Sequence, residues 1–289
     1  MDIGMEEDNL QYIAYHYCSA DTFINIMQSK VLWLCNLTES NDEDELRITY
    51  STIWDSVKEG LKSTDLNKDD LSDVIKIIDN QCKIQISVDP PFGICFCRQE
   101  DLLSQWKEYG DETKGLSLGF DLNWFIRHGI KQQKPMTSFI QSNAIGIDNV
   151  IYSSDQFVQD MTEAIYKAIK IDGKASWITR ITPTLKHYSG FIKNSSFKAE
   201  DEIRIVYYPV ASSMDFKVKD VSGISGLKTN VKDRYEIPWT DDSSQALRSI
   251  CIGHNCPLSE TDILEILRKN NLDTGINITK STIPYRVKG

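Results

Sequence analysis

The stretch FKAEDEIRIVYYP, residues 197–209, decides the fold class and contains the strongest polar pattern of the chain. Alternate residues of a β-strand point to the same side of the sheet. A strand over residues 200–208 would therefore place Glu200, Glu202 and Arg204 on one face. The opposite face would carry three apolar side chains: Ile203, Ile205 and Tyr207. Two carboxylates beside a guanidinium favour electrostatic chemistry, and the alternative is an exposed edge strand with a simple ion pair.

The overall charge limits the kinds of partner. The 289 residues carry a formal net charge of −10, which argues against non-specific binding to nucleic acids or anionic membranes. Residues 127–134 are a basic stretch, for which a solvated loop is the simpler interpretation. No apolar run approaches the roughly 20 residues of a membrane helix, and the acidic N-terminus lacks a signal-peptide pattern. We expect a cytoplasmic protein without membrane contact.

The cysteines point to the same compartment. There are seven, an odd number, and several lie inside apolar runs, including Cys35, Cys95 and Cys97. This distribution predicts reduced, buried thiols, as in cytosolic proteins. The spacing of the cysteine and histidine residues matches none of the usual zinc patterns, so we expect no metal.

The hydrophobic periodicity predicts an α+β fold with a single domain over residues 1–289. One sheet is expected to contain five strands: 12–18, 93–97, 115–121, 201–208 and 248–253. Helical periodicity dominates residues 46–86 and 122–195. We expect these two stretches to be helical insertions within the domain.

Three further polar or aromatic clusters are candidate site residues. His16 and Tyr17 end the first strand, where a histidine can bind a hydroxyl group or act as a base, although a structural role is the alternative. Trp106 and Tyr109 are three residues apart on a helix and could stack on a planar ring or simply pack in the core. Lys114 could bring a positive charge to a phosphate.

An acidic segment follows a short strand expected over residues 31–37 and contains Asn41, Asp42 and Glu45. A solvated turn is the simplest interpretation of this segment. The sequence contains no P-loop, Rossmann, nucleophile-elbow or zinc-protease motif. The residues alone therefore indicate a site but not a reaction.

Four segments together resemble the bacterial domain-of-unknown-function family 2971. Residues 16–45 have its HYT-like strand, a helix, a strand ending in Asn36, and an ND-x-x-E pattern in which Glu43 replaces a proline. Residues 102–121, LLSQWKEYGDETKGLSLGFD, match its middle motif. The third motif matches five residues: Lys193, Phe197, Glu200, Glu202 and Arg204. The tail IGH…INITKSTIPYR is similar to the family ending, with His254 where proline is usual.

The order of histidine, tyrosine and glutamate also resembles the H-Y-E arrangement of ADP-ribosyltransferases. This resemblance implies a split mixed or antiparallel sheet with a helical insertion, and NAD as the substrate. His16 would hold the nicotinamide ribose, and Tyr109 or Trp106 would stack on the nicotinamide ring. Glu202 would bind the ribose 2′-hydroxyl and stabilise an oxocarbenium-like transition state. Glu200 would orient or deprotonate the acceptor.

The same resemblance implies that other residues contact NAD. This cofactor-binding set adds four residues to His16, Trp106 and Tyr109: Tyr17, Asn36, Lys114 and Arg204. Arg204 lies two positions after Glu202 and could keep that carboxyl group ionised. No metal is needed for this chemistry.

The expected function is therefore an NAD-consuming ADP-ribosyltransferase or NAD glycohydrolase. A bacterial toxin or anti-phage defence role would follow, with a protein or nucleic acid as acceptor and an antitoxin or defence-system protein as partner. One alternative is a non-catalytic module that binds a nucleotide or a protein. The other is a metal-dependent hydrolase or nuclease that holds Mg²⁺ with Asn41, Asp42, Glu45 and Glu200.

Overall fold

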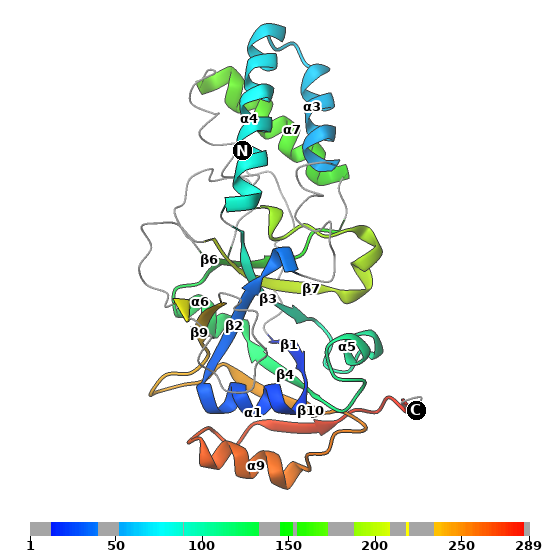
Figure 1. The fold of residues 1–289 in the computed structure, drawn as a ribbon, viewed down its shortest axis with the longest axis vertical. Coiled ribbons are helices and arrows are strands. Elements are labelled where there is room, and N and C mark those ends of the chain that lie inside the picture. Colours follow the sequence, from blue (N-terminus) through cyan, green and yellow to red (C-terminus); the bar gives the residue numbers. More distant parts are fainter. Residues whose placement is uncertain are drawn as a thin grey trace.

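Three helices stand above a large sheet in this α+β protein (Figure 1). The computed structural model describes eight stretches of the chain: 13–39, 52–88, 90–132, 145–152, 155–172, 188–208, 218–219 and 234–285. The upper helices are α3 (Trp54–Lys62), α4 (Lys68–Val88) and α7 (Asp155–Asp172). The predicted fold class, a mixed α+β domain, is confirmed.

Eleven strands in the described part of the chain join into one sheet. The strands are β1 (Ile13–Cys18), β2 (Val31–Asn36), β3 (Phe92–Cys97), β4 (Leu116–Asp121), β5 (Lys131–Gln132), β6 (Ile145–Asn149), β7 (Glu202–Tyr207), β8 (Val218–Lys219), β9 (Arg234–Pro238), β10 (Leu247–Ile252) and β11 (Asn277–Lys280). The main order is β11-β10-β4-β1-β3-β2-β9-β8, and β7, β6 and β5 branch from β3. Only the β10–β11 and β5–β6 pairs among these are parallel. The five strands expected to share a sheet are β1, β3, β4, β7 and β10, and they do share it.

The sheet divides at β3. One edge of β3 pairs with β7 from Phe92 to Cys97. The other edge meets β2 at Phe92 and Gly93, and it meets β1 at Cys97. Both strands are antiparallel to β3, so β1 and β2 run in the same direction and α1 (Ala20–Ser29) connects them. Between the two contacts β1 and β2 diverge, and the sheet opens into a fork.

The strand that contains the acidic pattern is an interior strand. β7 lies between β3 and β6, and all six of its residues are buried. The alternative of an exposed edge strand is therefore wrong. The strand begins at Glu202, after the predicted starts at residues 200 and 201, because residues 195–200 form the 3₁₀ helix η3 (Ser195–Glu200) and Asp201 has a left-handed backbone with φ 47°. Glu200 consequently lies on a helix end, whereas Glu202 and Arg204 do share one strand face.

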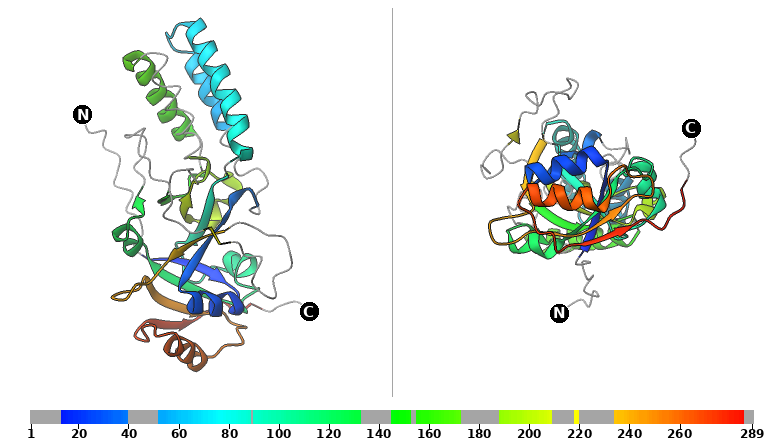
Figure 2. Two further views of the ribbon diagram at one scale, coloured as in Figure 1. Left: turned by 60° about the vertical axis from the view of Figure 1, so that its left-hand side comes forward. Right: turned by 90° about the horizontal axis from the view of Figure 1, so that it is seen from below.

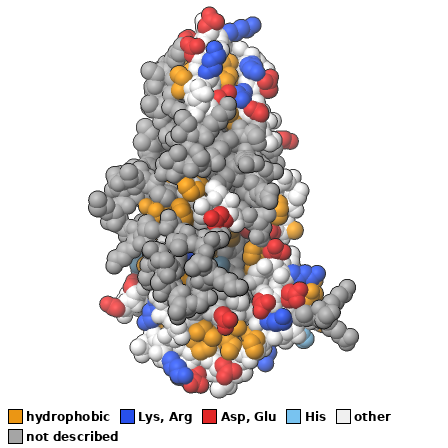
Figure 3. Space-filling view, viewed as in Figure 1, with side chains coloured by type: hydrophobic (Ala, Val, Ile, Leu, Met, Phe, Trp, Pro, Cys, Tyr) orange, Lys and Arg blue, Asp and Glu red, His pale blue; other side chains and the backbone are white. Residues whose placement is uncertain are grey.

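The helical insertions pack on one another more than on the sheet. α3, α4 and α7 bury a hydrophobic cluster of their own around Trp54, Val57 and Met161, and Figure 2 shows these helices standing away from the body. We call this unit the helical projection. Acidic and basic side chains mix on its visible tip (Figure 3). In the described residues, no helix is long and apolar enough to span a membrane.

The expected helical stretch 122–195 is only partly helical. It contains α6 (Leu122–Arg127), β5, β6 and α7, so part of it belongs to the sheet. Residues 173–187 of this stretch lie outside the described residues. Strand β6 pairs with β7 and thereby extends the branch that carries Glu202.

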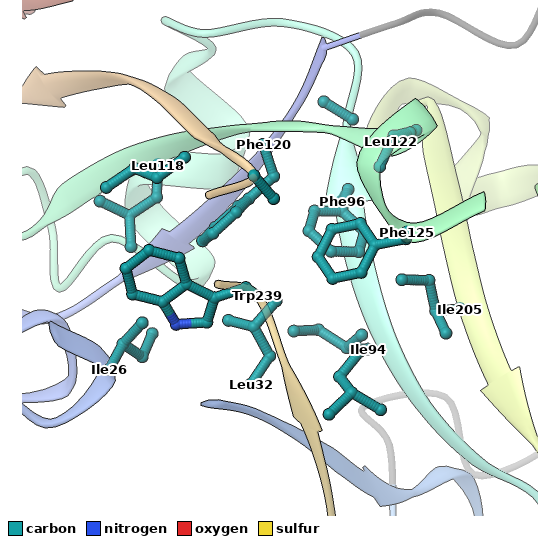
Figure 4. Packing of buried hydrophobic residues seen from close by; sticks show 14 of the residues in the cluster. Ile26, Leu32, Ile94, Phe96, Leu118, Phe120, Leu122, Phe125, Ile205 and Trp239 are labelled. Atoms are coloured by element: carbon teal, nitrogen blue, oxygen red, sulfur yellow. The ribbon is translucent and has the colours of Figure 1, made fainter. Parts of the chain in front are cut away.

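The main core lies between the sheet and three helices, α1, α6 and α9 (Glu260–Lys269). Figure 4 shows Trp239 beside Ile26 and Leu32, and its ring meets Phe120 edge-on at a centroid distance of 5.9 Å. α1 buries an i, i+3, i+4 face, and Ser19 caps it by accepting a hydrogen bond from the Thr22 amide. Helices α1 and α9 lie side by side (Figure 2, right). This core fixes the strands that border the fork.

Candidate functional site

A pocket of about 330 Å³ occupies the fork of the sheet. Its walls come from β1, α1, β2 and β3, with contributions from α5 (Leu103–Glu108), β7 and the segment before η3. Among the predicted site residues, six line this pocket: His16, Tyr17, Asn36, Tyr109, Glu202 and Arg204. The structure therefore brings together residues from widely separated parts of the sequence.

His16 supplies a hydrogen-bond acceptor to the pocket. Its Nδ1 lies 3.1 Å from the carbonyl oxygen of Cys95. A carbonyl can only accept, so Nδ1 carries the proton and donates it. Burial lowers the pKa of His16 and outweighs the opposite effect of the Cys95 bond, which leaves the ring neutral. The other ring nitrogen, Nε2, is then an acceptor suited to a hydroxyl group.

Tyr109 supplies a hydroxyl donor and an aromatic ring. It ends the six-residue helix α5, and its amide donates to the Gln105 carbonyl at 2.9 Å. Burial, and after it the charge of Glu200, raises the pKa of Tyr109 well above its usual range. The hydroxyl therefore stays protonated at any pH near neutrality.

A buried ion network lies behind the pocket. Arg204 donates to Glu202 Oε2 from Nη2 at 2.7 Å and from Nε at 3.1 Å. Lys193 donates to Glu200, and it lies 3.5 Å from Glu202 Oε1. The side chains of Lys193, Glu202 and Arg204 are 4%, 3% and 1% exposed, and that of Glu200 is 14% exposed. Two positive and two negative charges are thus enclosed together, and of the two Glu202 oxygens Oε1 is the more weakly held.

The network pushes the pKa values of its two carboxyl groups apart. Burial alone would raise the pKa of Glu202, but Arg204 and Lys193 outweigh burial and lower it. The pKa of Glu200 is raised, first by burial and then by the charge of Glu202, against the opposing effect of Lys193. Burial disfavours the charge of Lys193, yet Glu202 and Glu200 raise its pKa. In such a pair Glu202 is suited to remain a permanent anion, and Glu200 is suited to take up and release a proton.

Sequence reasoning gave no role to two residues that hold Glu202. Lys193 lines the pocket and its Nζ lies 4.7 Å from the centre of the Phe197 ring. Tyr152 accepts the backbone N–H of Glu202 at 2.9 Å through its hydroxyl. The family pattern contained Lys193, so its position in a motif with two acids was the available signal. Nothing in the sequence marked Tyr152.

Three predicted residues lie away from the pocket lining. Trp106 is fully buried beneath Tyr17, with ring centroids 4.9 Å apart, and its Nε1 donates to Asp101. The expected stacking of Trp106 on a ligand is therefore wrong, because its ring is enclosed in the core. Lys114 is exposed in the turn after α5 and does not line the pocket. Glu200 does not line the pocket, but it accepts a hydrogen bond from Lys193, which does.

Two lining residues use their polar atoms within the protein. Tyr17 donates its hydroxyl to the Gln99 carbonyl at 2.7 Å and accepts from the Leu102 amide at 2.9 Å. Asn36 Oδ1 accepts from the amide and the hydroxyl of Thr38. These side chains shape the pocket wall, and their predicted contact with a ligand stays a prediction.

The face of α1 toward the pocket carries neutral hydrogen-bonding groups. Thr22, Asn25 and Ser29 lie three and four residues apart, so they share one face of α1 and all line the pocket. Trp33 of β2 adds an aromatic ring, against which the Arg234 guanidinium lies at 4.5 Å from the ring centre. Neutral hydrogen-bonding groups beside an aromatic ring suit a nucleoside-like ligand.

The chain after α5 contains a strained turn. Asp111, Glu112 and Thr113 all have positive φ, at 47°, 53° and 71°. Left-handed backbone costs about 1–2 kcal/mol for each residue with a side chain. Thr113 is held there because its carbonyl accepts from the Asn255 amide at 3.0 Å. Gly253 is required nearby, since a Cβ there would lie 2.2 Å from the Thr113 oxygen.

Three of the four residues proposed for a metal site lie outside the part of the chain that the structure describes, and the fourth, Glu200, is paired with Lys193. The three are Asn41, Asp42 and Glu45. Within the described ranges, no group of three or more His, Cys, Asp or Glu side chains is arranged to hold a metal ion. The six cysteines with described side chains are thiols. Cys97 is buried as predicted, whereas Cys35 is exposed and Cys95 half-buried, and the latter two line the pocket.

The comparison with known families concerns the segment that carries Tyr109 and the ion network. Residues 105–205 match a family described as protein of unknown function (DUF2971). The matched segment includes Tyr109, Lys193, Glu200 and Glu202 but not His16. No curated protein and no solved structure matches the chain. The family resemblance is thus supported over α5 to β7, and for the opening and the tail it stays a prediction.

Proposed function

We propose that the chain is an NAD-consuming enzyme, either an ADP-ribosyltransferase or an NAD glycohydrolase, with its site in the pocket at the fork of the sheet. The observation that carries the proposal is that His16, Tyr109 and Glu202 line one pocket although they come from three distant segments. Convergence of this kind is the geometric requirement for a shared site. The fork between β1 and β2 is also compatible with the split sheet implied by the ADP-ribosyltransferase resemblance.

The electrostatics of the network suit cleavage of the bond between ribose and nicotinamide. When this glycosidic bond breaks, its electron pair stays with the nicotinamide nitrogen and the ribose carbon becomes positively charged. Glu202, with its lowered pKa, supplies a fixed anion that stabilises the charge as it develops. Its Oε1, held only at 3.5 Å by Lys193, is the atom available to a ribose hydroxyl.

The remaining steps fit the other residues. His16 Nε2 accepts a hydrogen bond from a second ribose hydroxyl, and the Tyr109 ring packs against the nicotinamide. An acceptor hydroxyl, from water or a macromolecule, then forms the new bond to the ribose carbon and loses its proton. Glu200, with its raised pKa, is the group in the network best suited to take that proton, with Lys193 between it and the pocket.

The biological role follows from the reaction. Uncontrolled NAD loss, or modification of a cellular protein or nucleic acid, would stop growth, so we propose a cytoplasmic toxin or anti-phage effector. Such an enzyme has to be kept inactive until it encounters its target. An antitoxin or another defence-system protein is therefore the expected partner.

A second candidate function is a non-catalytic module that binds a nucleotide or a protein in the same pocket. The specific observation in its favour is the enclosure of the Glu202 carboxylate, whose Oε2 is already bound twice by Arg204. A purely structural ion pair would look similar. The two candidates differ in whether bound NAD is consumed.

Incubation with NAD separates these candidates. The purified protein is incubated with NAD, with and without cell lysate, and free nicotinamide, free ADP-ribose and ADP-ribosylated macromolecules are followed separately. Nicotinamide with free ADP-ribose indicates a glycohydrolase, and nicotinamide with labelled macromolecules indicates a transferase. Saturable NAD binding without nicotinamide release would contradict the enzyme and support the binding module.

A further inference from the structure

Helix α5 is too short to hold its own position. It contains six residues, Leu103–Glu108, and isolated helices of that length do not form in water. Yet Tyr109 follows directly and must lie in the pocket wall. Contacts from elsewhere in the chain therefore have to fix α5.

Asp101 is the centre of those contacts. Its Oδ1 accepts from Trp106 Nε1 and from Ser281 Oγ, both at 2.7 Å. Its Oδ2 accepts from the Thr282 amide at 2.9 Å and from the Thr282 hydroxyl at 3.1 Å. One carboxylate thus joins α5, which leads directly into Tyr109, to Ser281, 180 positions later in the chain. Four donors on one carboxylate leave it little freedom to rotate.

Residues 281–285, which we call the C-terminal strap, hold the same region at a second point. Lys107 Nζ lies 5.3 Å from the centre of the Tyr285 ring. Asn255 Nδ2 donates to the Tyr285 carbonyl at 3.2 Å and to Thr113 Oγ1 at 2.7 Å. The strap is therefore tied both to α5 and, through Asn255, to the strained turn that follows Tyr109.

We propose that the C-terminal strap positions Tyr109 in the pocket, through Asp101 at the start of α5 and through Asn255 at the strained turn. Asp101 and Asn255 are positioning residues, because neither lines the pocket. Asp101 precedes α5, and Asn255 holds the strained turn that follows Tyr109. Together the two contacts fix the direction of α5 and the point at which the chain leaves it. This inference rests on the proposed role of Tyr109 as a ligand-contacting residue.

The test places a reporter on Tyr109 itself. The full chain is made with 3-fluorotyrosine at position 109, and the ¹⁹F resonance is recorded for four further substitutions. Asp101→Asn and Ser281→Ala remove hydrogen bonds to the strap. Ser281→Thr keeps the hydroxyl. Ser56→Ala is the matched control, because it removes a hydroxyl that donates to the Thr52 carbonyl in the helical projection.

Asp101→Asn and Ser281→Ala are expected to shift or broaden the fluorine resonance, whereas Ser281→Thr and Ser56→Ala leave it at the wild-type position. NAD affinity is expected to fall by about three- to tenfold for Ser281→Ala, as for one lost hydrogen bond. Ser281→Ala serves as the milder change if Asp101→Asn does not fold. An unchanged resonance in folded Ser281→Ala protein overturns the inference and leaves a purely structural strap.

The readouts keep this inference separate from the proposed function. A fluorine shift in Ser281→Ala protein supports positioning even if the wild-type protein binds no NAD, a result that would count against the proposed function alone. Conversely, NAD turnover with an insensitive fluorine resonance overturns the positioning role alone.

Discussion

Two ion clusters of the molecule have similar bond lengths but very different surroundings. In the network behind the pocket, Arg204 binds Glu202 at 2.7 Å, and their side chains are 1% and 3% exposed. On the helical projection, Lys170 binds Asp65 at 2.9 Å, with side chains 44% and 69% exposed. Water screens the second pair, so it contributes little to folding.

The comparison shows that distance alone does not decide what an ion pair does. Burying four charged groups costs several kcal/mol for each ion, and apolar residues of similar volume would often be more stabilising. The network behind the pocket is therefore poorly explained as a source of stability. Its contact with the pocket offers a better explanation, since a dry, pre-oriented anion is strongly effective on a developing positive charge.

The largest effect on stability is expected for Arg204→Met. The change leaves Glu202 buried without its main partner and should lower the free energy of unfolding by about 3–5 kcal/mol. Urea denaturation of Arg204→Met beside Lys170→Met, its counterpart on the projection, measures the difference. Equal, small losses in both variants would show that the buried network is not energetically distinct from the exposed pair.

Removing both charges should recover part of that loss. In the double variant Glu202→Leu with Arg204→Met no unpaired charge remains at this point, so stability should return by about 1–3 kcal/mol relative to Arg204→Met alone. The double variant should be inactive, because it lacks the Glu202 carboxylate. A double variant that is no more stable than the single one would mean that Arg204 acts mainly through its bond to the Gly190 carbonyl at 3.2 Å.

The two carboxyl groups of the network should titrate on opposite sides of the ordinary glutamate pKa of 4.5. Carboxyl ¹³C NMR is expected to assign the lower step mainly to Glu202 and the higher step mainly to Glu200. Because the folded pKa of Glu202 is lowered, its contribution to stability is present above pH 4.5 and is lost as the pH falls through the folded value. The reverse order of titration would remove the basis for giving Glu200 the proton-carrying role.

The smallest effect is expected on the projection. Asp65 accepts from Lys170 and from the Tyr166 hydroxyl in an exposed position, and these bonds lower its pKa. Asp65→Asn should leave NAD consumption unchanged and shift the melting temperature only slightly. A marked loss of activity in this variant would indicate that the projection is coupled to the pocket.

The strand periodicity correctly predicted that Glu202 and Arg204 share a face, because that relation is local. It could not show that the strand begins after Glu200, since a left-handed Asp201 and a 3₁₀ helix break the alternation there. It also suggested an edge strand as an alternative, whereas pairing of β7 with both β3 and β6 buries every residue. Strand neighbours are set by tertiary structure and not by the strand's own sequence.

The aromatic pair on α5 shows a second limit of sequence reasoning. The three-residue spacing of Trp106 and Tyr109 is compatible both with contact to a ligand and with packing in the core, so it cannot tell these roles apart. The structure separates the two: Trp106 packs against Tyr17 and donates a hydrogen bond to Asp101, whereas Tyr109 lines the pocket. The partners that decide this difference lie far away along the chain, and Asp101 itself is held by the C-terminal strap.

Nicotinamide release by Glu202→Gln, measured beside wild type, His16→Ala and Asp65→Asn, tests the central claim most directly. Glutamine keeps the shape and hydrogen-bonding capacity of Glu202 but removes the charge on which transition-state stabilisation depends. We expect Glu202→Gln to lower the rate by about 10²–10³-fold, with cooperative thermal unfolding retained, while Asp65→Asn keeps the wild-type rate. A well-folded Glu202→Gln protein that releases nicotinamide at the wild-type rate would contradict the proposed role of the buried network.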